Sequence, residues 1–252
     1  MIEIFVLSII QGITEFLPIS SSSHLILASK YLGFNNQNLS IDVSLHIGSF
    51  LAVIVFFKKD ILKFLKNKKI FFKILLSSIP VMIVGYILIK FDLIERLRNV
   101  KIIGWTTIVF GVLLFMSDRS KKIKNISKNF DYKSAAFVGF FQILSLIPGV
   151  SRSGITITAA RFLKFERVES AKISFLLSIP TLAAVSFYGV NNFIQNENSI
   201  LSLINLLSIF LSFTFSLITI KYFLKYIKEF SLNIFIIYRI ILGVVILFLA
   251  YL

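Results

Sequence analysis

The chain of 252 residues is strongly apolar, with 57% hydrophobic residues and a mean hydropathy of +0.89. This composition excludes an ordinary soluble domain and indicates a membrane protein. The net charge of +15 comes largely from lysine-rich loops without a nucleic-acid motif, so we predict that the chain's partner is a bilayer and not a nucleic acid. The absence of cysteine excludes disulfides, thiolate metal sites and cysteine nucleophiles.

The first apolar segment, residues 4–17, is interrupted by polar residues and stopped by Pro18. It lacks a basic leader, so we expect no cleavable signal peptide. A serine run and His24 follow, and a second apolar piece ends at Leu32. Each piece is shorter than the roughly 17–25 residues that cross a bilayer. We therefore predict a re-entrant pair of half-helices, whose broken backbone must be buried in protein or line a wet cavity.

Three longer apolar runs come next and predict full transmembrane helices at residues 41–57, 74–89 and 102–117. The second half of the chain then repeats the same plan. A short apolar piece begins at Ser134 and is broken at Pro148, and a second short piece ends at Leu163. Further spans are predicted at residues 173–188, 200–220 and 233–252.

These elements predict an all-α polytopic membrane protein with six full transmembrane helices and two re-entrant helix pairs. The whole chain, 1–252, forms one membrane domain with internal repeats at about 1–120 and 130–252. The segments Glu15-Phe-Leu-Pro-Ile-Ser-Ser and Ser145-Leu-Ile-Pro-Gly-Val-Ser align on their prolines, which supports the repeat. In such folds the broken helices of the two halves meet near the midplane and form the binding site.

The distribution of lysine and arginine predicts the topology, because basic loops stay on the cytoplasmic side. The predicted cytoplasmic segments are residues 58–73, 118–133, 164–172 and 221–230. The predicted external segments are residues 34–40 and 189–199 together with both termini. The first hairpin then enters from outside and the second from inside, so the repeat is inverted.

The segment Pro148-Gly-Val-Ser-Arg-Ser-Gly154 places an arginine inside apolar sequence, where a charge is costly. Pro148 ends a helix, and Ser151 or Ser153 can cap a new one whose free N–H groups point outward. A helix N-terminus beside the guanidinium of Arg152 predicts a phosphate site. The competing interpretation is a kinked helix whose arginine extends to the interface.

The first hairpin offers complementary chemistry. Gln11 and Glu15 share one helix face, and Ser21 and His24 share a face of the next half-helix. With Arg152, this set suits phosphoryl transfer by in-line attack. A serine nucleophile needs a base, for which we expect His24, while Glu15 orients the histidine or holds a divalent cation. Spacing leaves open which serine acts.

Other polar residues have more ordinary interpretations. We interpret His46 as a polar packing group, and we expect Asp42 and Arg239 to lie at the interface near span ends. Arg161 is either a second phosphate contact or an anchor at the interface.

The segment Gln11-Gly-Ile-Thr-Glu15-Phe-Leu-Pro-Ile-Ser-Ser-Ser-Ser-His24 closely resembles the first motif of the undecaprenyl-pyrophosphate phosphatases of the bacitracin-resistance type. The proline–glycine–arginine segment resembles their second motif, and the likeness covers the whole chain. It implies hydrolysis of the C55 isoprenyl pyrophosphate carrier to the monophosphate used in cell-wall synthesis. It also implies a bacterial inner-membrane enzyme that depends on a divalent cation, Mg or Ca, and has an externally open site.

The resemblance implies catalytic roles for Glu15, Ser21, His24 and Arg152, with Glu15 as a metal ligand. It implies that the phosphate and the pocket are lined by Gln11, Ser20, Ser151, Ser153 and Thr156. Gln11 stands where many family members carry Glu, which weakens a two-carboxylate metal site. Four serines stand where many members have Ser-Ser-Thr-Gly, so the choice of nucleophile is open.

The alternative function is a transporter or flippase for a phosphorylated lipid, because inverted repeats with broken helices are typical of alternating access. A carrier needs an anion clamp but no nucleophile with its base. The sequence leaves the oligomeric state, including a homodimer, open.

Overall fold

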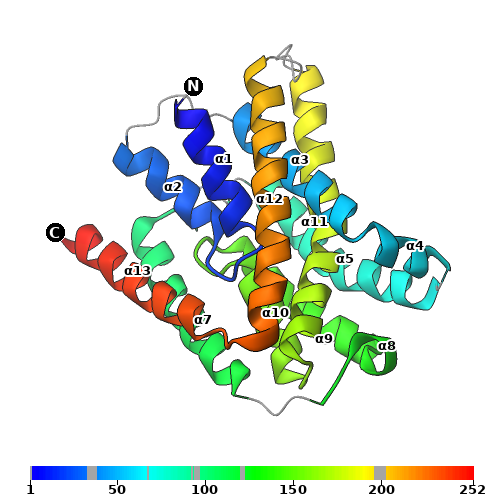
Figure 1. The fold of residues 1–252 in the computed structure, drawn as a ribbon. Coiled ribbons are helices and arrows are strands. Elements are labelled where there is room, and N and C mark those ends of the chain that lie inside the picture. The colour runs from blue at the N-terminus through cyan, green and yellow to red at the C-terminus, as the bar shows by residue number, and fades with distance from the viewer. Residues whose placement is uncertain are drawn as a thin grey trace.

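The computed structural model describes residues 2–32, 39–66, 68–91, 93, 97–119, 123–195 and 203–252. In these ranges the secondary structure is helical apart from turns and one isolated bridge between Lys124 and Phe165. Figure 1 shows the helices gathered into one bundle. Of the two predicted external loops, residues 34–38 and 196–199 lie outside the described residues, whereas residues 39–40 and 189–195 are helical.

The first predicted hairpin is present as α1 (Ile2–Thr14) and α2 (Ser21–Leu32). Between them the chain turns at Pro18, and Ser20 adopts a left-handed backbone conformation with φ +77°. This conformation costs a residue other than glycine about 1–3 kcal/mol and is concentrated at functional sites. The Ser20 carbonyl accepts the first hydrogen bond of α2, from His24 N.

The second hairpin has the same design. It consists of α9 (Tyr132–Ile143), the 3₁₀ turn η1 (Leu144–Leu146) and α10 (Arg152–Phe162). Ser151 also has a positive φ of +70°, and its hydroxyl caps α10 by accepting a hydrogen bond from Gly154 N at 3.1 Å. Gly149, with φ +94°, lies so close to Thr106 that a larger residue would collide with it.

Five described helices are long and apolar enough to cross a membrane: α5 (Lys68–Lys90), α7 (Val100–Asp118), α11 (Arg167–Gln195), α12 (Leu203–Glu229) and α13 (Asn233–Tyr251). In α11 the apolar span covers Arg167–Asn191. Helix α3 (Leu39–Phe56) lies where the first full span was predicted, but it is shorter than these five helices. Two small helices, α4 (Lys58–Lys66) and α8 (Ile126–Asn129), lie in the lysine-rich stretches. The protein is therefore an all-helical, multi-pass membrane protein.

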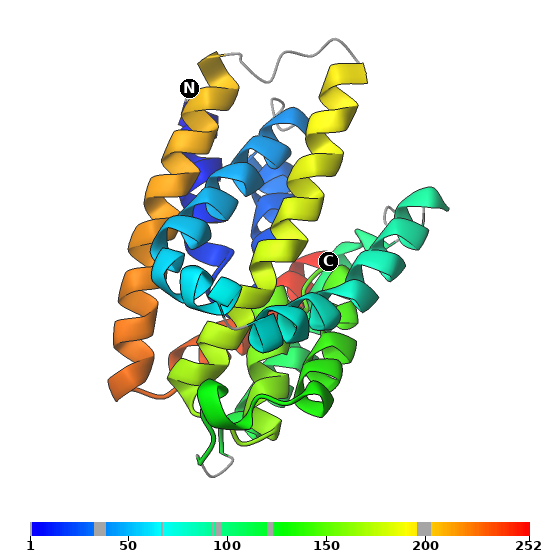
Figure 2. The ribbon, with the colours of Figure 1, turned by 90° about the vertical axis from the view of Figure 1, so that its right-hand side faces the viewer.

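The two halves of the chain interlock. Helix α1 packs on α12, and α9 packs on α5, so each hairpin lies against a long helix of the other half. Figure 2 shows α3 between α11 and α12, and α13 crosses α7 in Figure 1. Gly12 of α1 meets Phe215 of α12, and Gly139 of α9 meets Ser77 of α5, so the helix backbones approach closely in both pairs.

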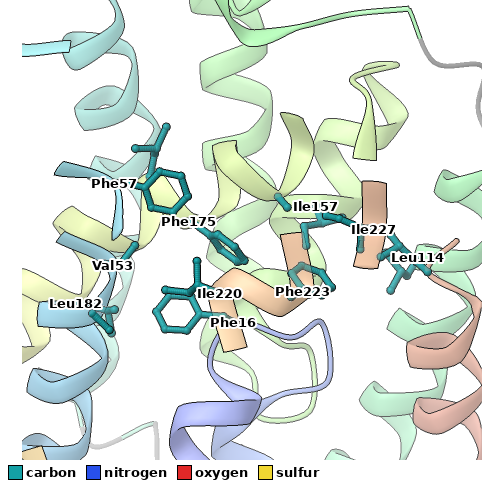
Figure 3. Packing of buried hydrophobic residues seen from close by; sticks show 14 of the residues in the cluster. Phe16, Val53, Phe57, Leu114, Ile157, Phe175, Leu182, Ile220, Phe223 and Ile227 are labelled. Atoms are coloured by element: carbon teal, nitrogen blue, oxygen red, sulfur yellow. The ribbon is translucent and has the colours of Figure 1, made fainter. Parts of the chain in front are cut away.

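The main apolar core anchors the first turn. Phe16 follows Glu15 directly and is fully buried. Its ring packs edge to face against Phe175 of α11, with centroids 5.3 Å apart, and Ile220 of α12 lies beside it (Figure 3). Because the next side chain in the sequence is fixed in the core, the backbone at Glu15 is fixed as well.

A buried ionic cluster joins four segments at Asp118, the last residue of α7. The Asp118 carboxylate accepts hydrogen bonds from Arg161 Nε at 3.2 Å, from Arg167 Nη2 at 2.7 Å and from Leu232 N at 3.3 Å. Arg161 is fully buried here. Both expectations for Arg161 were therefore wrong, because this guanidinium is an internal partner of Asp118.

We expect Asp118→Asn to destabilise the fold by about 3–5 kcal/mol, because it leaves two guanidinium groups without their counter-charge. The free energy of unfolding in detergent, measured by chemical denaturation, tests this. Lys172→Gln is the control, since its pair with Glu169 is partly exposed, joins residues one turn apart on the same helix and should contribute less than about 1 kcal/mol. Equal losses in both variants would contradict the structural role of Asp118.

Candidate active site

The two hairpins meet at the carboxylate of Glu15. One oxygen, Oε1, accepts a hydrogen bond from Arg152 Nη2 at 2.8 Å. The other, Oε2, accepts from Ser21 Oγ at 2.6 Å and from Gln11 Nε2 at 3.0 Å. Glu15 is buried, so this is an ion pair between residues 137 positions apart in the chain and inside the protein. Four of the predicted residues are thus in one connected group.

The contact between Ser21 and Glu15 has the geometry of a nucleophile and its base. A general base must lie about 2.6–3.2 Å from the atom whose proton it takes, and the observed distance is 2.6 Å. The hydroxyl donates to Oε2, so its proton already points at the carboxylate. Glu15 can therefore accept the proton of Ser21 when the hydroxyl attacks an electrophile.

His24 has different partners from those expected. Its Nδ1 lies 2.6 Å from the Ser20 carbonyl oxygen, to which it donates, and its Nε2 lies 2.6 Å from the Tyr238 hydroxyl. The rings of His24 and Tyr238 stack, with centroids 5.8 Å apart. The expected pairing of His24 with the Ser21 hydroxyl is not among these contacts, and Glu15 holds that hydroxyl instead.

The serines of residues 20–23 form hydrogen bonds with one another and with Glu15. The Ser20 hydroxyl lies 2.9 Å from the Ser23 hydroxyl, and both side chains are buried. Ser21 is half-buried, whereas Ser22 is exposed. Of the four hydroxyls, the one on Ser21 contacts the Glu15 carboxylate.

On the second hairpin, Arg152 is the first residue of α10. Its side chain keeps 14% of its surface exposed, so a ligand can reach it while it pairs with Glu15. Nη1 also lies 3.4 Å from the Ser174 carbonyl oxygen. A guanidinium at a helix N-terminus combines its own positive charge with the free N–H groups and dipole of the helix, and both favour a bound phosphate.

The other hydroxyls of this hairpin have partners within the protein. Ser153 donates to the Leu17 carbonyl at 2.6 Å and thereby ties the two turns together. The Ser151 hydroxyl lies 3.1 Å from that of Ser153. Thr156 is fully buried, with its hydroxyl 2.8 Å from that of Ser174. These residues support the backbone around Arg152.

Arg239 of α13 joins both turns, and the expectation that it lies at the interface was wrong. The side chain is fully buried. Nη1 donates to the carbonyls of Pro18 at 3.2 Å and Val150 at 3.0 Å, and Nη2 donates to that of Gly149 at 2.8 Å. Arg239 is two helical turns inside an apolar run, so its depth was a signal in the sequence that the interfacial interpretation missed.

His46 of α3 also belongs to the edge of the site. Its Nδ1 lies 3.0 Å from Gln11 Nε2, the same nitrogen that donates to Glu15. The sequence interpretation of His46 as a polar packing group therefore omitted its connection to the carboxylate.

The residues present fit a divalent cation only in a limited way. Within the described residues no group of three or more His, Cys, Asp and Glu could hold a metal ion. Glu15 is a single carboxylate that already accepts from three donors. Mg²⁺ is commonly held by one or two carboxylates together with the phosphates of the substrate. Glu15 is thus the available protein ligand, and the phosphate oxygens would have to supply most of the others.

An apolar groove of about 350 Å³ adjoins the site between α1, α12 and α13. Its lining includes Ile13, Leu17, Thr219 and Phe235. Leu17 connects the groove with the turns, because its carbonyl holds Ser153. The groove is apolar and large enough to hold part of a hydrocarbon chain.

Comparison with known proteins shows the family to which the chain belongs. The family described as "Bacitracin resistance protein BacA" matches residues 4–245. An undecaprenyl-diphosphatase of Pelagibacter ubique (strain HTCC1062) is 49% identical over 99% of this chain and 98% of that protein. One of Jannaschia sp. (strain CCS1) is 36% identical over 98% of both chains. Undecaprenyl-diphosphatase 1 of Pseudoalteromonas translucida (strain TAC 125) is 40% identical over 96% of both. The chain belongs to the BacA family of bacitracin resistance proteins.

Proposed function

We propose that the chain hydrolyses undecaprenyl pyrophosphate to undecaprenyl phosphate and inorganic phosphate, which returns the lipid carrier to cell-wall synthesis. The observation that carries this proposal is the single carboxylate of Glu15 with Ser21 on one oxygen and Arg152 on the other. A nucleophile with its base then lies beside a phosphate-binding cation. The names of the relatives support the same reaction.

In the proposed first step the terminal phosphate binds to Arg152 and the N-terminus of α10. Ser21 Oγ attacks the terminal phosphorus, and its proton passes to Glu15 Oε2. The bond from that phosphorus to the bridging oxygen breaks, and undecaprenyl phosphate leaves. Arg152 stabilises the charge that develops on the phosphoryl oxygens. Glu15 passes its proton to the departing undecaprenyl phosphate and is a carboxylate again. Water then attacks the phosphorus of the seryl phosphate, and Glu15 takes a proton from this water. Glu15 returns the proton to Ser21 Oγ as the bond between phosphorus and the serine oxygen breaks, and inorganic phosphate is released.

His24 and the groove complete the proposed site. His24 lies one helical turn after Ser21 and is held between the Ser20 carbonyl and Tyr238, so we assign it to the wall of the phosphate pocket. The groove beside Leu17 takes the prenyl chain, because apolar surface matches apolar ligand. A bound divalent cation would neutralise charge on the pyrophosphate, with Glu15 as its protein ligand.

The carrier alternative is not favoured. A flippase needs to bind the phosphate head group, but it gains nothing from a serine hydroxyl held 2.6 Å from a buried carboxylate. The relatives in the comparison are named as diphosphatases.

The proposed architecture has six spans, including α3, and two re-entrant pairs, α1–α2 and α9–α10. Its inverted repeats are residues 1–120 and 130–252. The reciprocal packing of α1 on α12 and α9 on α5 supports this symmetry, as do the left-handed serines before α2 and α10. We place the protein in the bacterial inner membrane with its site open to the outer side, because lysine-rich segments are usually retained on the cytoplasmic side of a membrane.

The activity test is phosphate release from C15 and C55 prenyl pyrophosphates by purified protein in detergent. We expect wild-type turnover and none for Ser21→Ala, because that variant lacks the attacking hydroxyl. Ser22→Ala is the matched control, since its exposed hydroxyl does not contact Glu15, and it should remain close to wild type. A Ser21→Ala protein with substantial turnover would exclude direct attack by Ser21.

We expect Arg152→Ala to lower kcat/KM by at least about a hundredfold, the scale of losing one preorganised charge contact. Steady-state kinetics with the C15 substrate measure this. Arg119→Ala, which removes an exposed guanidinium stacked on Phe115, should leave kcat/KM within about twofold. If Arg152→Ala kept nearly wild-type kcat/KM, the proposed contact between Arg152 and the phosphate would be excluded.

The orientation can be tested with single cysteines, because the chain has none of its own. Lys228 and Leu252 are exposed at the ends of α12 and α13. We expect Leu252→Cys to react with a membrane-impermeant maleimide in intact spheroplasts. Lys228→Cys should react only after the membrane is permeabilised. The reverse labelling pattern would invert the proposed topology.

A further inference from the structure

The amide of Gln11 is held entirely through its nitrogen. Nε2 lies 3.0 Å from Glu15 Oε2 and 3.0 Å from His46 Nδ1. The side chain is fully buried, and Oε1 has no hydrogen-bond partner. The two acceptors at the nitrogen therefore set the orientation of this amide, and His46 is one of them.

The direction of these hydrogen bonds follows from the groups involved. An amide nitrogen only donates, so His46 Nδ1 accepts and carries no proton in this arrangement. One amide hydrogen points to His46 and the other to Glu15. If the amide turned over, Oε1 would face the carboxylate oxygen, and two acceptors would repel each other.

We propose that His46 is a positioning residue of the phosphatase site, acting on Glu15 through Gln11; this inference rests on the proposed function. His46 keeps the amide nitrogen of Gln11 directed at Oε2. Gln11 in turn keeps the carboxylate in the orientation in which Oε2 meets Ser21 and Oε1 meets Arg152. His46 itself takes no proton from the substrate or from Ser21.

Loss of the imidazole should act on the chemical step. Without the acceptor at His46, Glu15 alone holds the buried amide of Gln11, so the amide can tilt and Glu15 loses its fixed position relative to the Ser21 hydroxyl. Misplacement of a reacting group by about 1 Å can lower the rate by about a hundredfold. Arg152 and the N-terminus of α10 remain in place, so substrate binding should change little.

The test measures kcat and KM for phosphate release by full-length protein in detergent. His46→Leu fills similar space without an acceptor, and kcat should fall about tenfold to a hundredfold while KM stays within about twofold. His46→Gln restores an acceptor oxygen, so kcat should lie within about threefold of wild type. Ser49→Ala, one turn further along α3, removes a buried contact with Ser212 and Ser216 and should leave kcat unchanged.

A double-mutant cycle separates positioning from packing. Because His46 acts through Gln11, Gln11→Leu together with His46→Leu should be no slower than Gln11→Leu alone. His46→Met provides a second apolar variant if the leucine variant does not fold, as judged by its thermal unfolding. Additive losses, equal losses in the leucine and glutamine variants, or wild-type kcat in both apolar variants would overturn the inference. Absence of phosphate release by wild-type protein would instead overturn the proposed function.

Discussion

The ion pair between Glu15 and Arg152 is the contact on which the rest of the structure depends. Each charge would be very costly alone in an apolar interior, and each is accommodated because the other hairpin supplies its partner. The fold provides that proximity by breaking two helices and bringing the two breaks together. The interlocked packing of each hairpin on a long helix of the other half holds the broken ends in place.

The turns before α2 and α10 are stabilised by side chains from other parts of the chain. Ser20 and Ser151 have left-handed backbones, which are unfavourable for serine. Hydrogen bonds from Arg239 to the carbonyls around both turns and from Ser153 to Leu17 offset this cost. Polar side chains that look isolated along the sequence thus form hydrogen bonds with the carbonyl groups of the turns, which have no partner within a helix.

Residue types and spacing predicted the helical fold, both breaks and the convergence of Glu15, Ser21 and Arg152. These features depend on local rules: proline ends a helix, serine caps one, and buried charges need partners. The partners of His24, Arg161 and Arg239 could not be predicted, because they depend on how distant helices cross. Tyr238, for example, follows His24 by 214 positions and reaches it only through the packing of α13.

The hydrogen bonds of Arg239 also bear on how the enzyme works over a catalytic cycle. One side chain holds carbonyl groups from both halves of the molecule, so moving one half against the other would break its hydrogen bond to Pro18 while those to Gly149 and Val150 remain. Alternating exposure of the pocket to the two leaflets would therefore cost the buried contact between Arg239 and Pro18. This contact favours a catalytic centre that keeps one arrangement while the lipid head group enters and leaves.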